Sequence, residues 1–202
     1  MRHKPVVKLS RSINLALTDK AARLMERRPY PPGEHGRRPR RNMSSYKERL
    51  LEKQRLRFQY HVSEKQLTRY YEKARRQTER TTGDALLGLL ESRLDALVLR
   101  SGFAKTIYQA RQFVSHGHVL VNGKRIDRPG YHVLPGTKIS ISAKSAAKTP
   151  FEFVKQEVEP AAPPTYIRVD RKSLEFVLEA VPARDLIPVI CNEQYVVEFY
   201  AR

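Results

Sequence analysis

The sequence predicts an α+β protein in which helices come first, a mixed region follows, and a single helix ends the chain. Apolar residues recur at helical spacing over residues 46–90, whereas short alternating runs characteristic of strands come later. The last helix has an apolar face that needs a partner, and the early helices supply one. We therefore expect a mainly helical N-terminal domain completed by the C-terminal helix, with an inserted domain that carries a small antiparallel sheet. The expected parts are an arm at 1–43, a helical domain at 44–91 plus 184–202, and an inserted domain at 92–183.

The first 43 residues predict an extended, basic arm. The 202-residue chain has 39 Lys+Arg against 21 Asp+Glu, a net charge of +18, and residues 1–60 hold 17 basic but only 5 acidic residues. Prolines and glycines in RRPYPPGEHGRRPRR (27–41) exclude a regular helix there, although Thr18 can cap a short helix that runs to Arg28. This charge opposes compaction and indicates a polyanionic partner. Nucleic acid is the first candidate, and an anionic membrane surface is the alternative.

Several classes of protein are disfavoured by composition. The chain has no run of 18 apolar residues that could span a membrane, and its first residues lack the apolar core of a signal peptide, so we expect a cytoplasmic protein. The single cysteine, Cys191, cannot form an internal disulfide or a structural zinc site. His116 and His118 have no third ligand nearby in the sequence. No metal or cofactor is therefore expected.

Two basic, amphipathic helices are predicted at about 46–60 and 64–78. Ser45 with Glu48 and Ser63 with Gln66 have the spacing of capping boxes. Asp84 can cap a third, leucine-rich helix. Basic side chains on the first two helices are candidates for contacts with a polyanion, with a solvated face as the alternative: Lys53, Arg55, Arg57, Arg69 and Arg76.

Residues 93–126 predict a helix, a loop, a second helix, a tight turn, a strand and a hairpin reversal. Thr106 with Gln109 has capping-box spacing, and Gly117 can end the second helix in the left-handed conformation. Asn122-Gly123 is a strong hairpin signal. The unit brings side chains that donate hydrogen bonds onto neighbouring edges. Such a surface suits the binding of a polyanion better than catalysis. These side chains are Lys105, Arg111, Gln112, His116, His118, Asn122 and Lys124.

The rest of the chain predicts short strands and two helices. Asn192 can cap the last helix. The elements expected before it are strands at 131–134 and 138–141, a helix at 151–158, a stiff connector at 159–164, and an antiparallel pair at 166–169 and 174–178.

Taken together, these motifs resemble the bacterial ribosomal protein S-four family of the small subunit. Residues 93–126 look like the RNA-binding module called the alpha-L motif, which some RNA-modifying enzymes and a heat-shock protein also carry. The flanks are more specific to the family: SSYKERLLEKQRLRFQYHVSEKQLTRYYEKA, GDALLGLLESRLDALVLRSGFAKT and IPVICNEQYVVEFYAR. Many members have four cysteines around zinc near the N-terminus. This chain lacks them there and is similar to the zinc-free version.

The resemblance implies a non-enzymatic, ribosome-bound protein that binds the 5′ domain of 16S rRNA and nucleates assembly of the 30S body. It also implies a part in translational accuracy, through an interface with ribosomal protein five of the small subunit. The residues that match this interface are Tyr46, Asn192, Glu193, Val197 and Tyr200. The arm matches the segment lining the channel by which mRNA reaches the ribosome, and its arginines there are Arg37, Arg38, Arg40 and Arg41.

Two other classes of function are weighed against this one. An RNA-modifying enzyme with the same module needs a catalytic domain, and the roughly 60 residues before the last helix are too few for one. The aspartates of this region, Asp95, Asp127, Asp170 and Asp185, form no pattern of nucleophile and base. A non-ribosomal RNA-binding or stress protein is disfavoured by the long arm and the family-specific C-terminal segment.

Overall fold

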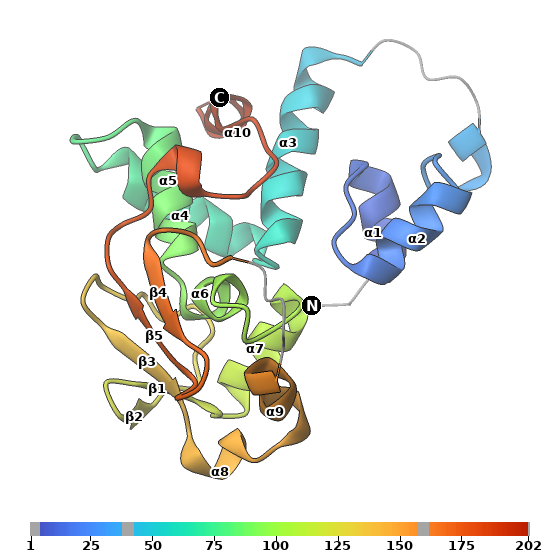
Figure 1. Ribbon diagram of the computed structural model, residues 1–202. Coiled ribbons are helices and arrows are strands. Elements are labelled where there is room, and N and C mark those ends of the chain that lie inside the picture. Colours follow the sequence, from blue (N-terminus) through green and yellow to red (C-terminus); the bar gives the residue numbers. More distant parts are fainter. Residues whose placement is uncertain (1–4, 38–42, 157–161, 202) are drawn as a thin grey trace. The chain divides into compact units, whose positions relative to one another are not determined.

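The structure is a computed structural model that describes residues 5–37, 43–156 and 162–201 (Figure 1). The chain divides into two compact units. The terminal unit comprises Met1–Gly83 and Val189–Arg202, and the central unit comprises Asp84–Pro188. The terminal unit therefore contains both ends of the chain, and the central unit contains its middle.

Helices alone make up the regular structure of the terminal unit within its described residues. Ser63 and Gln66 form the predicted reciprocal capping box, and the Thr18 hydroxyl accepts from the backbone N–H of Ala21. The cap before the first long helix is Ser44 rather than Ser45, one residue earlier in the Ser-Ser pair. The elements are α1 (Val6–Ile13), α2 (Asp19–Arg27), the 3₁₀ helix η1 (Glu34–Arg37), α3 (Ser45–Gln59), α4 (Glu64–Arg75) and α10 (Glu193–Tyr200).

The described part of the arm is folded, which differs from the extended arm that the sequence predicts. α1 and α2 pack together, and Ile13 of α1 and Ala21 of α2 are both buried. Asn14 takes the left-handed conformation (φ 52°) that ends α1, where Asn is the common substitute for Gly. Arg11 donates to the carbonyl oxygens of Tyr30 and Pro31, at 3.0 and 3.2 Å. A long-range side-chain contact therefore fixes the proline-rich segment, and local propensity does not reveal such contacts.

The C-terminal helix α10 contacts the N-terminal helices α3 and α4. Asn192 caps α10 as predicted, since its side chain accepts from the backbone N–H of Tyr195. Val196 is fully buried. The Glu198 carboxylate lies 2.6 Å from Nε of Arg49, and the Tyr200 ring stacks on Tyr71. Apolar and polar contacts thus hold the last helix against helices more than 100 residues earlier in the chain.

The central unit combines helices with a five-stranded antiparallel sheet of order β2-β1-β3-β5-β4 (Figure 1). The antiparallel pair predicted at 166–169 and 174–178 forms as β4 and β5. The elements are α5 (Thr82–Glu91), α6 (Leu94–Arg100), α7 (Ile107–Ser115), β1 (Val119–Val121), β2 (Lys124–Arg125), β3 (Lys138–Ile141), α8 (Ala143–Ala146), α9 (Thr149–Gln156), β4 (Ile167–Asp170), β5 (Glu175–Leu178) and the 3₁₀ helix η2 (Arg184–Leu186).

One hydrophobic core joins α6, α7, α9 and the sheet. Phe103 and Phe176 meet edge to face at 5.4 Å between ring centroids. Phe113 of α7 and Phe151 of α9 approach to 4.7 Å. The core therefore fixes α7 and β1, and the residues of the predicted polyanion surface lie on α7 and in the segments that flank these two elements.

Three predicted elements differ in the structure. Residues 131–134 form a single bridge, Arg93 with His132, because the backbone at Tyr131 and Val133 pairs with residues 92–94 instead of a strand. α5 begins at Thr82, so Asp84 lies in its first turn rather than at its cap. α9 begins two residues before the predicted start at Phe151, and residues 157–158 lie outside the described residues.

Candidate nucleic-acid interface

Helix α7 presents a buried face and a polar face, as its spacing predicts. Ile107, Ala110, Phe113 and Val114 are buried, whereas Gln112 on the opposite side is exposed. The Thr106 hydroxyl accepts from the backbone N–H of Gln109. The side-chain oxygen of Gln109 accepts from the backbone N–H of Lys105 at 2.8 Å, whereas a capping box would use the N–H of Thr106, the next residue. The loop that carries the exposed Lys105 is thereby fixed to the first turn of α7.

The turn from α7 into the hairpin brings further cations to the same end of the helix. Gly117 has φ +70°, the left-handed conformation that the sequence predicts. A β-carbon at this position would also collide with the Arg125 guanidinium, whose Nη2 donates to the carbonyl of His116 at 3.4 Å. Arg125 therefore lies over the turn. The exposed Lys124 precedes it on the same strand.

Asn122 fixes the orientation of this hairpin. Asn122 and Gly123 both have positive φ, at 47° and 78°, as the predicted two-residue turn requires. The Asn122 side-chain oxygen accepts from the backbone N–H of Lys138 at 3.1 Å. The side chain predicted to contact a polyanion is therefore engaged within the sheet through its oxygen.

His118 lies among several cationic groups. Its Nδ1 is 2.8 Å from the Ser145 hydroxyl, and its ring is 5.9 Å from that of His116. Burial, together with the charges of Lys148, His116 and Arg125, lowers the pKa of His118 from its ordinary 6.5. The sequence places Lys148 about 30 residues away from His118, so its part in this cluster was not predicted. A group of positive charges without a described carboxylate partner is suited to an anion.

Arg111 has a structural role that the sequence did not reveal. Its Nη1 lies 2.7 Å from Oδ2 of Asp95, which is completely buried. Arg93, also buried, donates to both carboxylate oxygens of Asp95, at 3.0 and 2.7 Å. Arg111 thus links α7 to α6, with a quarter of its side chain exposed. It is only partly available to a ligand.

A second buried carboxylate joins α5 and α6 to the sheet. Glu91 is fully buried, pairs with Arg100, and accepts from the Tyr166 hydroxyl at 2.7 Å. Burial and the nearby Glu91 charge raise the pKa of Tyr166 well above its ordinary 10.0. Tyr166 therefore remains a hydrogen-bond donor at all ordinary pH. These two carboxylates hold the scaffold together rather than offering catalytic groups.

The basic residues predicted on α3 and α4 separate into two groups. Lys53 is 5% exposed, pairs with Glu64 at 2.9 Å and lies 4.5 Å above the Phe199 ring, so its charge is used inside the terminal unit. The structure gives no support for Lys53 as a nucleic-acid contact. Arg55 and Arg57 are half-buried and donate to backbone carbonyls of Ile13 and Val62. Arg69 and Arg76 are exposed.

Of the four arginines predicted in the arm, the structure describes Arg37. It is exposed, and it donates to the hydroxyl of Tyr30 at 3.1 Å while lying 5.1 Å from that ring. This hydrogen bond and the charges of Arg37, Arg28 and Arg11 lower the pKa of Tyr30. The other three, Arg38, Arg40 and Arg41, lie outside the described residues.

The residues predicted at a protein interface belong to α3 and α10. Tyr46 is 52% exposed. Glu193 packs against Gly83, and Tyr200 donates to Glu64 at 2.8 Å. Burial, together with the hydrogen bond to the Glu64 carboxylate and its charge, raises the pKa of Tyr200 above its ordinary 10.0. Asn192 is exposed and caps α10, whereas Val197 is half-buried on that helix.

Two absences concern only the part of the chain that the structure describes. It contains no group of three or more His, Cys, Asp or Glu side chains placed to hold a metal ion. It also contains no helix long and apolar enough to cross a membrane.

Comparison with known proteins agrees with this geometry. Residues 1–91 match the family described as Ribosomal protein S4/S9 N-terminal domain, and residues 92–139 match the S4 domain. The small ribosomal subunit protein uS4 of Streptomyces griseus is 52% identical over 201 residues, which is 98% of each chain. That of Bifidobacterium adolescentis is 54% identical over 205 residues, covering 100% of this chain and 98% of the relative. Adjacent family matches and full-length relatives lead to one conclusion: the chain belongs to the uS4 family of structural proteins of the small ribosomal subunit.

Proposed function

We propose that this protein binds the 5′ domain of 16S rRNA and nucleates assembly of the 30S body. Membership of a non-enzymatic ribosomal family and the S4 domain at 92–139 support RNA binding. The observation that carries the proposal is the convergence of basic side chains around the end of α7. Arg125 donates to the carbonyl of His116, the His116 ring lies 5.9 Å from that of His118, and Lys124 precedes Arg125 on β2.

The surface suits folded RNA better than a base-specific code. Its donors are guanidinium, ammonium, imidazole and amide groups on rigid elements, which match phosphates and 2′-hydroxyl groups. Gln112 and Lys124 are exposed, whereas Arg111 is partly used by Asp95. We therefore assign the main RNA contacts to the exposed Gln112 and Lys124. Arg111 would contribute through the guanidinium N–H groups that do not bind Asp95. Binding should weaken steeply with salt, because each neutralised phosphate releases counterions.

Replacing Lys124 and Arg125 together with methionine should weaken binding to the 16S 5′-domain RNA and flatten its salt dependence. Removing two phosphate contacts is expected to reduce the slope of log K against log[salt] by about 2. Filter binding over a salt series measures this slope. Lys65 and Lys172 are exposed lysines outside the S4 domain, and their double methionine variant is the charge-matched control. Equal slopes in the two variants would contradict this assignment of the surface.

Binding should also depend on pH through His118. Without RNA its pKa lies below 6.5, so the ring is largely neutral at pH 7. A phosphate beside the ring favours the charged form, so RNA raises this pKa and binding takes up a proton. Affinity should therefore rise as pH falls from about 8 towards 6. The His118→Gln protein should show a flatter profile, whereas the exposed His132→Gln control should keep the wild-type profile. An identical profile in His118→Gln would exclude the coupling.

The arm and the C-terminal helix support two finer proposals. Arg37, with Arg38, Arg40 and Arg41, would hold mRNA phosphates in the channel through which mRNA reaches the ribosome. The exposure of Arg37 supports this proposal.

The face around Tyr46 would meet ribosomal protein five and influence translational accuracy. The 52% exposure of the Tyr46 ring supports this proposal. Tyr200 and Glu193 already make contacts inside the terminal unit, which favours Tyr46 as the first residue to substitute. Stoichiometric recovery in salt-washed small subunits tests the ribosomal role directly.

A further inference from the structure

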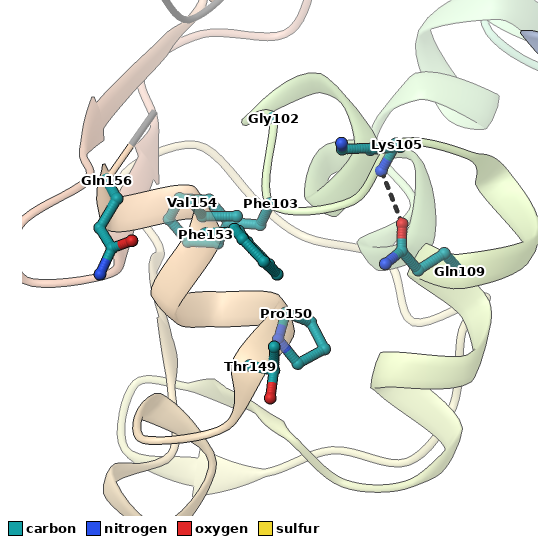
Figure 2. Close-up of a pocket in the computed structure, with 9 residues that line it drawn as sticks. All are labelled: Gly102, Phe103, Lys105, Gln109, Thr149, Pro150, Phe153, Val154 and Gln156. Carbon is teal, nitrogen blue, oxygen red and sulfur yellow. Dashed lines mark hydrogen bonds between the residues drawn. The ribbon is translucent and has the colours of Figure 1, made fainter. Parts of the chain in front are cut away.

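A groove of about 630 Å³ lies in the central unit between the start of α7 and helix α9 (Figure 2). Phe103 and Val154 form part of its apolar lining. Figure 2 shows the Phe153 and Pro150 rings extending from α9 towards the α7 side, while the side chain of Lys105 reaches in from the opposite wall. The groove thus combines an aromatic ring with a cation across one space.

The fold does not require Phe153 at this position. α9 is anchored by Phe151, which is 1% exposed, and Val154, which is 8% exposed. Phe153, on the same helix, is 65% exposed. A scattered exposed apolar residue needs no explanation, but this ring borders a concave site of the size that small ligands occupy. Its surface is therefore available for a partner.

The polar groups of the groove favour an anionic partner. Among the described residues that line the groove, Lys105 is the one cation and none is a carboxylate. The side-chain oxygen of Gln109 accepts from the backbone N–H of Lys105 at 2.8 Å, which fixes the orientation of the amide and its NH₂ donors. Both residues belong to the stretch that matches the S4 domain, whereas α9 lies beyond it. The groove thus extends the candidate RNA surface onto a helix outside the shared module.

We propose that this groove receives one unpaired nucleotide of the bound rRNA, with its base stacked on Phe153 and its phosphate beside Lys105. The inference rests on the proposed function and names the RNA element that the groove takes. Proteins read RNA mainly where bases are unstacked and can lie on aromatic side chains. An apolar peptide segment is a poorer fit, because it would cover the Lys105 ammonium and the Gln109 amide without giving either a partner. A nucleotide supplies a planar ring, polar edges and a negative charge.

The test separates stacking from general apolar contact by three substitutions of Phe153. Affinity for the 16S 5′-domain RNA should fall about tenfold in Phe153→Ala and Phe153→Leu, the order expected for one base–aromatic stack. Phe153→Trp should bind within about twofold of wild type, because it keeps a ring for stacking. Leu134, 62% exposed in the same unit, supplies the control Leu134→Ala, which should bind as wild type. Chemical probing should reveal one base that wild type protects and Phe153→Leu leaves reactive.

The outcomes distinguish this inference from the proposed function. If every Phe153 variant binds and protects the RNA as wild type does, while the Lys124/Arg125 double variant loses affinity, the nucleotide site is wrong and rRNA binding stands. If the double variant also binds as wild type, the proposed RNA surface itself fails. If Phe153→Leu binds RNA normally but reconstituted subunits lose a neighbouring protein, the groove belongs to a protein segment and the inference is overturned. Circular dichroism of each variant checks that the substitutions leave the fold intact.

Discussion

Replacing Asp95 with alanine is expected to lower the free energy of unfolding of the central unit by about 3–5 kcal/mol, the range found when one partner of a buried ion pair is removed. Asp95 is fully buried and receives two bonds from Arg93, which is 1% exposed, and one from Arg111. It also accepts from the backbone N–H of Ala96 at 3.0 Å. Without the carboxylate, the buried Arg93 guanidinium would lose both of its bonds to Asp95.

The comparison variants make this prediction specific. Asp127→Ala removes an exposed carboxylate from the same unit and should change stability by less than about 0.5 kcal/mol. Arg111→Met should cost less than Asp95→Ala, because Asp95 keeps both bonds to Arg93. Hydrogen exchange of α6 and α7 amides is the measurement of choice, since a chain of two units need not unfold in one step. A loss below about 1 kcal/mol in Asp95→Ala would contradict a structural role for the buried pair.

This network also affects how RNA binding is tested. Arg111 belongs to the polar side of α7 by sequence spacing, which makes it the obvious residue to substitute in a test of the RNA surface. Because Arg111 pairs with a buried carboxylate, that substitution would change stability and RNA contact together. Lys124 and Arg125 are exposed on the hairpin, and the one described side-chain hydrogen bond of Arg125 is to the His116 carbonyl rather than to a buried carboxylate, so their substitution affects stability less. Choosing them keeps the folding and binding predictions independent.

The features that were predictable from sequence depend on near neighbours. The Ser63–Gln66 box, the Asn192 cap and the Asn122-Gly123 turn each involve residues within a few positions, so their chemistry is visible in the sequence. The β4–β5 pair was predictable for the same reason, because only a short turn separates its two alternating runs. Local signals therefore located most elements and the donors around α7.

The features that were missed depend on distant residues. α1 begins after Pro5 with two β-branched valines, which are weak helix formers, and its burial of Ile13 depends on packing with α2. Lys53 was predicted on α3 together with Arg55 and Arg57, which are half-buried, yet Glu64 and Phe199 enclose Lys53 almost completely. The groove beside Phe153 needs α9 to lie against the start of α7, some 45 residues earlier in the chain. Sequence periodicity indicates which face of a helix is polar, but not which partner reaches that face.

In the terminal unit, Val196→Asp should cause the largest loss of stability, about 4 kcal/mol or more. Val196 is fully buried on α10, so the substitution places a carboxylate in an apolar contact between α10 and the N-terminal helices. Gln194→Asp adds the same charge two residues earlier, at an exposed position in the first turn, where the helix dipole favours an acid. That control should be nearly neutral. Hydrogen exchange of α3 and α10 amides would reveal the difference.

The pH dependence identifies the buried charge as the cause. Burial raises the pKa of the introduced aspartate, so its penalty should shrink as pH falls towards about 5 and the group takes up a proton. The native contact between Tyr200 and Glu64 survives in this range. Burial opposes ionisation of Glu64, but hydrogen bonds from Lys53 and Tyr200 outweigh it and hold the pKa below the ordinary 4.5. Its stabilising contribution is therefore complete above about pH 4.5 and is lost only in stronger acid. A penalty that does not change between about pH 8 and 5 would point to steric misfit instead of charge, and would mean that water reaches the α10 contact.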